Sequence, residues 1–288
     1  MKTVRMITRH GVDTGFADRR AAELAEQLPN FVDLAKGRPT ALRAVLKLSL
    51  DEAGLRCATD PAASWADTWD SFALATQAAS AVFVVASRSD GEVGFRLGDE
   101  DVRVAATGPS EQNDALTWLT ALYLAMVFRD QARINFLVGV PVELLRTAGL
   151  DHDDYVYSLV RMWQAYWKGA GDLVELTLAA MRLADPELVV HSTSRSVLHV
   201  YFPLIETFYR FVLRDGAKFD QALASALQLY RKFWAEDEES ETNPRGFVAL
   251  GLLALAGHAR DMGMSIDVES EYLPLCLLNG NRLGERAL

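Results

Sequence analysis

One pair of residues in this chain has the chemistry and spacing of metal ligands. His258 and Asp261 stand three positions apart in a segment with helical spacing, so both side chains would lie on one helix face. Metal-dependent phosphohydrolases bind ions with His and Asp side chains, and His191 and His199 could complete such a site. No His-Glu-x-x-His or repeated Glu-x-x-His pattern accompanies the pair. A metal-dependent phosphohydrolase is therefore kept as an alternative function, and a hydrogen-bonded pair is favoured.

Other signatures of catalysis are missing from the sequence. There is no Gly-x-Ser-x-Gly nucleophile turn, no phosphate-binding loop and no glycine-rich dinucleotide turn. Cys57 and Cys276 stand far apart and outside any catalytic or zinc-binding pattern. We therefore expect a protein that is not an enzyme and that needs no cofactor or metal ion.

Carboxylates are concentrated in two short segments that could bind a basic partner. The first, AEDEESETNPRG, lies between two predicted helices and carries Glu236, Asp237, Glu238, Glu239 and Glu241. Clustered acids accelerate association with a basic surface and disfavour wrong partners, without needing a concave pocket. The simpler interpretation is a solvated loop whose last acids stabilise the start of the next helix at Asn243.

The second acidic segment, LDHDDYVYS at residues 150–158, combines carboxylates with tyrosines. We select Asp153, Asp154 and Tyr155 as candidate partner-binding residues, because tyrosine is enriched at protein interfaces. An acidic first turn of a helix is an equally simple explanation, since carboxylates are favourable near a helix N-terminus. Both acidic segments are thus candidate binding surfaces with a structural alternative.

The net charge favours a protein partner over a nucleic acid. The 288 residues include 29 basic and 39 acidic side chains, which give a formal charge of −10. Such a surface repels phosphate backbones, so we expect no nucleic-acid binding. The first residues lack the apolar run of a signal peptide, and the apolar stretch at 246–257 is about half as long as a membrane span. With only two cysteines, the sequence predicts a cytoplasmic protein that binds no membrane.

Helical periodicity dominates the chain and would position all of these residues. Apolar side chains recur at three- and four-residue intervals in several segments. The stripe richest in aromatic area is Val156, Leu159, Trp163, Tyr166 and Trp167. We predict an all-α protein, a multi-helical array of antiparallel helical hairpins. Pro29 is expected to kink or split the first helix near Leu28.

One segment departs from the helical pattern. Residues 92–107, EVGFRLGDEDVRVAAT, alternate apolar and polar side chains on both sides of a Gly-Asp turn. We predict a small β-hairpin near 93–106, in which residues 93–97 pair with residues 102–106 and the hairpin packs on helices. No flexible linker interrupts the sequence, so residues 1–288 are expected to form a single helical domain. If the chain divides, the boundary falls near 88–110.

The end of the chain carries a recognisable pattern. GFVALGLLALAGHARDMGMSIDVESEYLPLCLL joins an apolar helix to an Asp-x-Gly turn, a short extended segment at 264–268 and a Ser-x-Tyr-Leu-Pro sequence. This stretch resembles the C-terminal signature of the immunity protein 49 family, bacterial proteins of polymorphic toxin systems. RHGVD around His10, FRDQ at 128–131 and DGAKFDQALASALQLYRKFW at 215–234 are also similar to the family pattern.

The resemblance implies a mostly helical bacterial protein that neutralises a cognate toxin by tight, stoichiometric binding in the cytoplasm. A nuclease toxin with a basic groove would suit the acidic surface, and the sequence leaves the oligomeric state open. The family supplies no catalytic or ligand residues. Its signature residues are expected to be structural: Gly263 would end the helix, Tyr272 would anchor the tail and Pro274 would block further helix, with Asp261 and Ser270 completing the signature. A helical scaffold that binds peptides in a concave groove is the other alternative.

Overall fold

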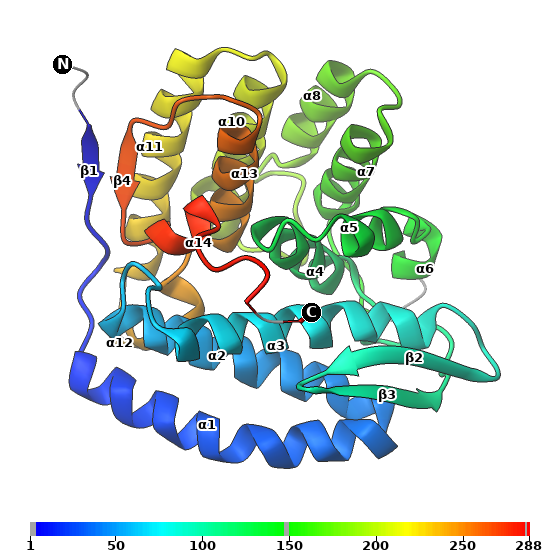
Figure 1. Ribbon diagram of the computed structural model, residues 1–288. Coiled ribbons are helices and arrows are strands. Elements are labelled where there is room, and N and C mark those ends of the chain that lie inside the picture. The colour runs from blue at the N-terminus through cyan, green and yellow to red at the C-terminus, as the bar shows by residue number, and fades with distance from the viewer. Residues whose placement is uncertain (1–3, 147–149, 286) are drawn as a thin grey trace.

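Three long helices near the N-terminus form one layer of the fold, shown in blue and cyan in Figure 1. They are α1 (Thr14–Gly37), α2 (Leu42–Thr59) and α3 (Ala66–Ala86), with a short 3-10 turn at Pro39–Ala41. Helix α2 packs against both α1 and α3, so the layer consists of two successive helical hairpins. The structure is a computed structural model that describes residues 4–146, 150–285 and 287–288.

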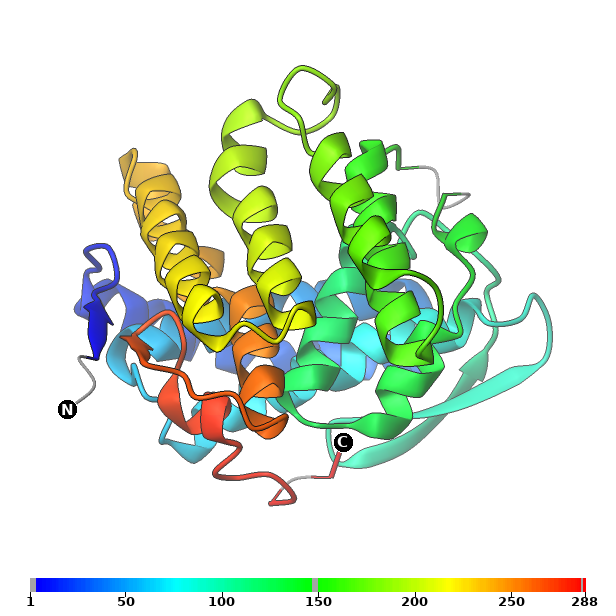
Figure 2. The same ribbon diagram turned by 90° about the horizontal axis from the view of Figure 1, so that it is seen from above.

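The rest of the chain builds a second group of helices on this layer, shown in green to red in Figure 1 and from above in Figure 2. Its helices are α4 (Ala115–Val127), α5 (Gln131–Val138), α6 (Val142–Arg146), α7 (Asp154–Lys168), α8 (Leu173–Leu183), α9 (Ser194–Ser196) with the π-helical turn Val197–Tyr201, α10 (Phe202–Val212), α11 (Gly216–Trp234), α12 (Glu238–Thr242) with the 3-10 turn Pro244–Gly246, α13 (Leu250–Asp261) and α14 (Leu275–Asn279). Helices α7 and α8, and α10 and α11, again form hairpins. The predicted all-α array of helical hairpins is confirmed.

The core of the second group is rich in aromatic side chains. Trp163 of α7 is fully buried, with its ring centre 4.6 Å from that of Phe208 in α10 and 5.9 Å from that of Tyr123 in α4. Burial of each such large side chain contributes about 1.5–3 kcal/mol. The aromatic stripe predicted on this helix is therefore core at Trp163, and Tyr166 and Trp167 are partly buried against it.

Helix α3 is long and apolar enough to cross a membrane by length and composition, the only such helix in the described part of the chain. Of its most apolar 18-residue window, 83% is buried inside the protein. It packs between α2 and α4, which cover it from both sides. This is the environment expected for the core helix of a helical array.

The predicted β-hairpin is confirmed, with a small difference in its bounds. β2 (Glu92–Leu97) pairs antiparallel with β3 (Glu100–Ala105), so that Val93 lies opposite Val104 and Phe95 lies opposite Val102. The turn consists of two residues, and its Gly98 has the positive φ of 63° that such turns require. The hairpin packs against α3 and α1, which supply the apolar surface that an isolated hairpin lacks.

Helix α1 continues through Pro29, so of the two expected outcomes, a kink or a split, the split does not occur. Proline has no N–H, and the carbonyl of Ala25 therefore loses its usual donor within the helix. Buried Leu24 and Leu28 precede Pro29 and buried Ala35 follows it, and α1 packs along α2 on both sides of the proline. This packing keeps both halves helical despite the missing hydrogen bond.

Two distant segments pair at one edge of the fold. β1 (Arg5–Ile7) and β4 (Val268–Ser270) form a parallel two-stranded sheet, seen beside α11 in Figure 1. The hydroxyl of Ser270 also donates to the carbonyl of Ile7 at 2.7 Å. The extended segment predicted near the C-terminus thus forms its strand with the N-terminus of the chain.

Candidate functional site

His258 and Asp261 each have their own partner within the protein. His258 Nε2 lies 2.6 Å from the hydroxyl of Tyr166, and its ring packs against Trp167. Burial lowers the pKa of His258 and so favours the neutral ring. Asp261 forms an ion pair with Arg129, with 2.9 Å between Oδ2 and Nε. Within the described ranges, no three His, Cys, Asp or Glu side chains gather as metal ligands would. The contacts of this pair are those of structural residues.

The acidic segment at 236–241 forms a short, exposed helix. Asp237 caps its N-terminus by accepting the N–H of Ser240 at 2.8 Å, and this bond holds the pKa of Asp237 below its ordinary value. Glu236 forms an ion pair with Arg195. The other carboxylates are accessible, with Glu238 and Glu239 exposed and Glu241 half-buried. The segment could meet a partner, but capping already explains part of its composition.

The second acidic segment divides into buried and exposed residues. Asp153 is 7% exposed and Tyr155 is completely buried, so neither side chain can contact a partner in this structure. Asp153 accepts the backbone N–H groups of residues 190, 191 and 192 at 2.5, 3.0 and 2.7 Å, and Tyr155 bonds to Ser192. Of the three selected residues only Asp154 is exposed, and it pairs with Arg146 at 2.9 Å. The partner-binding prediction is therefore corrected for Asp153 and Tyr155, which hold a loop.

The signature residues near the C-terminus hold the tail in place. Gly263 lies just after α13 with a φ of 83°, and Tyr272 is completely buried. The Tyr272 hydroxyl accepts the N–H of His10 at 3.1 Å and lies 2.8 Å from Nδ1 of the same residue. Burial lowers the pKa of His10 to about 4. The prediction for Pro274 is wrong, because this residue directly precedes α14, where a helix start does not need its missing N–H.

Two arginines missed by the sequence reasoning complete this arrangement. Arg9 is 6% exposed and donates to two carbonyls at the end of α2, at 2.7 and 3.1 Å. Arg129 pairs with the signature residue Asp261 and donates to two carbonyls of α14, at 2.9 and 2.7 Å. Both arginines stand in the two short sequences, RHGVD and FRDQ, noted above for their similarity to the family pattern. Their place in these two short sequences was the feature from which a structural role could have been predicted.

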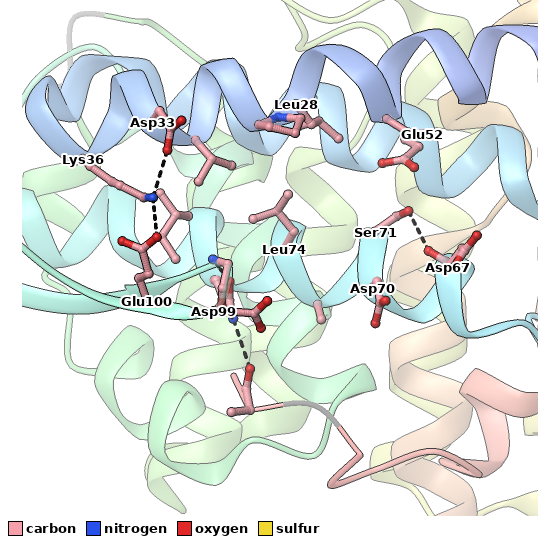
Figure 3. A pocket seen from close by; sticks show the side chains of 18 of the residues that line it. Leu28, Asp33, Lys36, Glu52, Asp67, Asp70, Ser71, Leu74, Asp99 and Glu100 are labelled. Atoms are coloured by element: carbon pink, nitrogen blue, oxygen red, sulfur yellow. Dashed lines mark hydrogen bonds and ion pairs between the residues drawn. The ribbon is translucent and has the colours of Figure 1, made fainter.

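A pocket of about 620 Å³, which we call the acidic groove, lies between α1, α2, α3 and the β2–β3 turn (Figure 3). Its apolar floor includes Leu28 of α1, Leu74 of α3 and Leu97 of β2. Carboxylates lie toward both ends: Asp33, Asp99 and Glu100 at one, and Glu52, Asp67 and Asp70 at the other. None of these residues was predicted as a site, because they come from separate segments of the chain.

Among the residues that the structure describes, six carboxylates and two cations line the acidic groove. Lys36 Nζ lies 2.9 Å from Asp33 and 2.8 Å from Glu100, which places it between two acids. At the other end, Arg56 Nε donates to Glu52 at 2.8 Å. Glu52 is 5% exposed, and burial raises its pKa while Arg56 acts in the opposite direction. The groove therefore carries an excess of negative charge around an apolar floor.

A second pocket, of about 570 Å³, lies between α2, α4 and the 3-10 turn before α13. Its most buried ionisable residue is Asp114, which caps α4 by accepting the N–H groups of Leu116 and Thr117. Asp114 also contacts His152 at 3.1 Å and Arg43 at 3.2 Å. Burial opposes ionisation, but these contacts lower the pKa of Asp114 to about 2. The polar groups of this pocket are thus engaged in holding the fold.

The fold and these sites define an all-α protein with carboxylate-rich surfaces and, in the part of the chain described, no metal-ligand cluster. Residues 60–277 match the family described as immunity protein 49, and the chain belongs to this family. The protein is thus an immunity protein by family. No curated protein and no solved structure shows a significant match to the chain. The matched residues include α3, the hairpin and the C-terminal signature, and α1 precedes them.

Proposed function

We propose that this protein neutralises a cognate bacterial toxin by direct, stoichiometric binding in the cytoplasm. The observation that carries the proposal is the family match across residues 60–277. The formal charge of −10 and the accessible carboxylates favour a toxin with a basic surface, such as a nuclease whose groove must bind phosphates. Tight complexes need only a few well-packed central residues in an interface of ordinary size.

The contacts of the ionisable residues support binding over catalysis. His258 and Asp261, the pair considered for a phosphohydrolase, are engaged with Tyr166 and Arg129. Buried Asp114 and Asp153 accept hydrogen bonds at helix and loop termini. These residues stabilise the helices that present the outer surface, and the proposal assigns the recognition of the toxin to that surface.

The test is protection of a bacterial host from the toxin domain encoded beside this gene. We expect co-expression to restore growth and the two proteins to purify as an equimolar complex. Growth arrest in the presence of folded, abundant immunity protein would refute the proposal, as would rescue without any complex. A metal analysis of the same preparation addresses the alternative, because a stoichiometric bound metal ion would favour the phosphohydrolase.

A further inference from the structure

We propose that the acidic groove receives an amphipathic, cationic segment of the toxin, with basic side chains at the two ends of the groove and an apolar side chain on its floor. This assignment rests on the proposed function and names the surface and the partner chemistry that carry it out. It also unites the immunity function with the peptide-binding groove considered from the sequence.

Charge complementarity is the first argument. Six carboxylates surround the groove, and its two cations are each shared between two acids: Lys36 between Asp33 and Glu100, and Arg56 between Glu52 and Asp67. The contact between Arg56 and Asp67 is long, at 3.5 Å, and the Asp67 side chain is 71% exposed. An incoming Lys or Arg can therefore pair with Asp67 without first breaking a short ion pair.

The shape of the groove is the second argument. The lining residues of α3 run from Asp67 to Gln77, which at the rise of an α-helix spans about 15 Å. An extended segment of about four or five residues covers this length. Leu28 and Leu74 lie between the acidic ends in Figure 3, so a segment that places cations at both ends must lay its middle on an apolar floor.

Hydrogen-bonding capacity gives a third argument for a donor-rich occupant. Ala25 and Pro29 both line the groove, and Pro29 removes the usual helical donor to the Ala25 carbonyl. Carboxylate and carbonyl oxygens accept hydrogen bonds, whereas Lys and Arg side chains only donate them. The described lining contains no group of three metal ligands, which argues against a metal ion as the occupant.

The experiment measures association and dissociation rates with the purified toxin domain encoded beside this gene. The groove variant is Asp67→Asn with Asp99→Asn, which removes one charge toward each end and conserves side-chain shape. The matched control is Glu143→Gln with Glu187→Gln, which removes the same charge from exposed positions outside the groove and outside both acidic segments. Thermal unfolding of each variant verifies that it is folded before binding is measured.

We expect the groove variant to bind about tenfold more weakly, with a slower association rate and a shallower salt dependence, and the control to stay within about twofold of the wild type. A photoreactive benzophenone side chain at position 100 should crosslink to the toxin, and one at position 239 should not. Wild-type affinity in the groove variant, or crosslinking from position 239 alone, overturns the groove assignment while the immunity function stands. Failure of the wild-type protein to bind the toxin refutes the proposed function itself, and this assignment with it.

Discussion

Asp153 and Asp154 are adjacent residues of the same type, and replacing each by asparagine should have very different effects on stability. The Asp153 carboxylate is buried and accepts three backbone N–H groups of the loop at 190–192. The Asp154 carboxylate is 68% exposed and pairs only across the surface with Arg146 among the contacts described for it. Asp153→Asn removes the charge that this loop is built around, and Asp154→Asn is its matched control.

The size of the difference follows from the pKa of Asp153. Burial opposes ionisation, but the hydrogen bonds from the loop lower this pKa from 3.8 to about 2. At about 1.4 kcal/mol per unit of pKa, the lowering corresponds to about 2.5 kcal/mol of folding free energy at pH 7. The exposed pair of Asp154 with Arg146 contributes about 0–1 kcal/mol.

The same pKa shift determines how the contribution of Asp153 to folding stability depends on pH. Because the pKa of Asp153 is lower in the folded than in the unfolded protein, its contribution is complete above about pH 4 and is lost as the pH falls toward 2. Urea unfolding should show Asp153→Asn to be about 2–3 kcal/mol less stable than wild type at pH 7, and about half as much less stable near pH 3. Equal stabilities of the two variants at pH 7 would refute this account of Asp153.

Two further stability predictions follow from close contacts in the structure. Gly54→Ala would place a Cβ 2.2 Å from the carbonyl oxygen of Pro244. Thermal unfolding should therefore show a loss of about 1–3 kcal/mol in folding stability, despite the better helix propensity of alanine. In the control Gly37→Ala the new Cβ meets nothing within 4 Å, so this change should be neutral or stabilising. The pKa of His10 is about 4 in the folded protein, below that of an unfolded histidine, so the wild type should lose stability as the pH falls from about 6.5 to 4. His10→Gln should remove part of that loss, with His258 accounting for a remainder, and an unchanged pH slope would contradict the assignment.

Structural features that depend on residues close together in the sequence could be predicted from it. The hairpin follows from strict alternation around a Gly-Asp turn, and the buried stripe of α7 follows from three- and four-residue spacing. The pairing of β1 with β4 could not be predicted, because two three-residue strands about 260 positions apart carry no pattern that identifies each other. The sequence left open whether Pro29 would kink or split the first helix, and packing against α2 keeps the helix unbroken.

The candidate site shows the same division between local and long-range information. Both acidic segments chosen from the sequence are next to helix starts: Asp237 caps α12, whereas Asp153, at the start of α7, accepts N–H groups of the loop at 190–192 and none of its own helix. Helix N-termini favour carboxylates for their own stability, so a dense run of acids marks a cap as readily as a binding surface. Nothing in the sequence distinguishes Asp153 from Asp154, since the loop that buries one of them arrives from residues 190–192.

The acidic groove acquires its charge in the opposite way, by folding. Its six carboxylates come from three helices and one hairpin turn, spread between Asp33 and Glu100, and no stretch of the sequence contains more than two of them close together. Packing α1 and the hairpin against α3 brings them around one apolar floor, where the cations of the proposed partner would meet several carboxylates at once. Isolated surface pairs contribute little, whereas charges gathered around a partly desolvated pocket act together. An interface built on such a groove should therefore lose affinity when only two of these dispersed aspartates are neutralised, although each looks like an ordinary surface residue in the sequence.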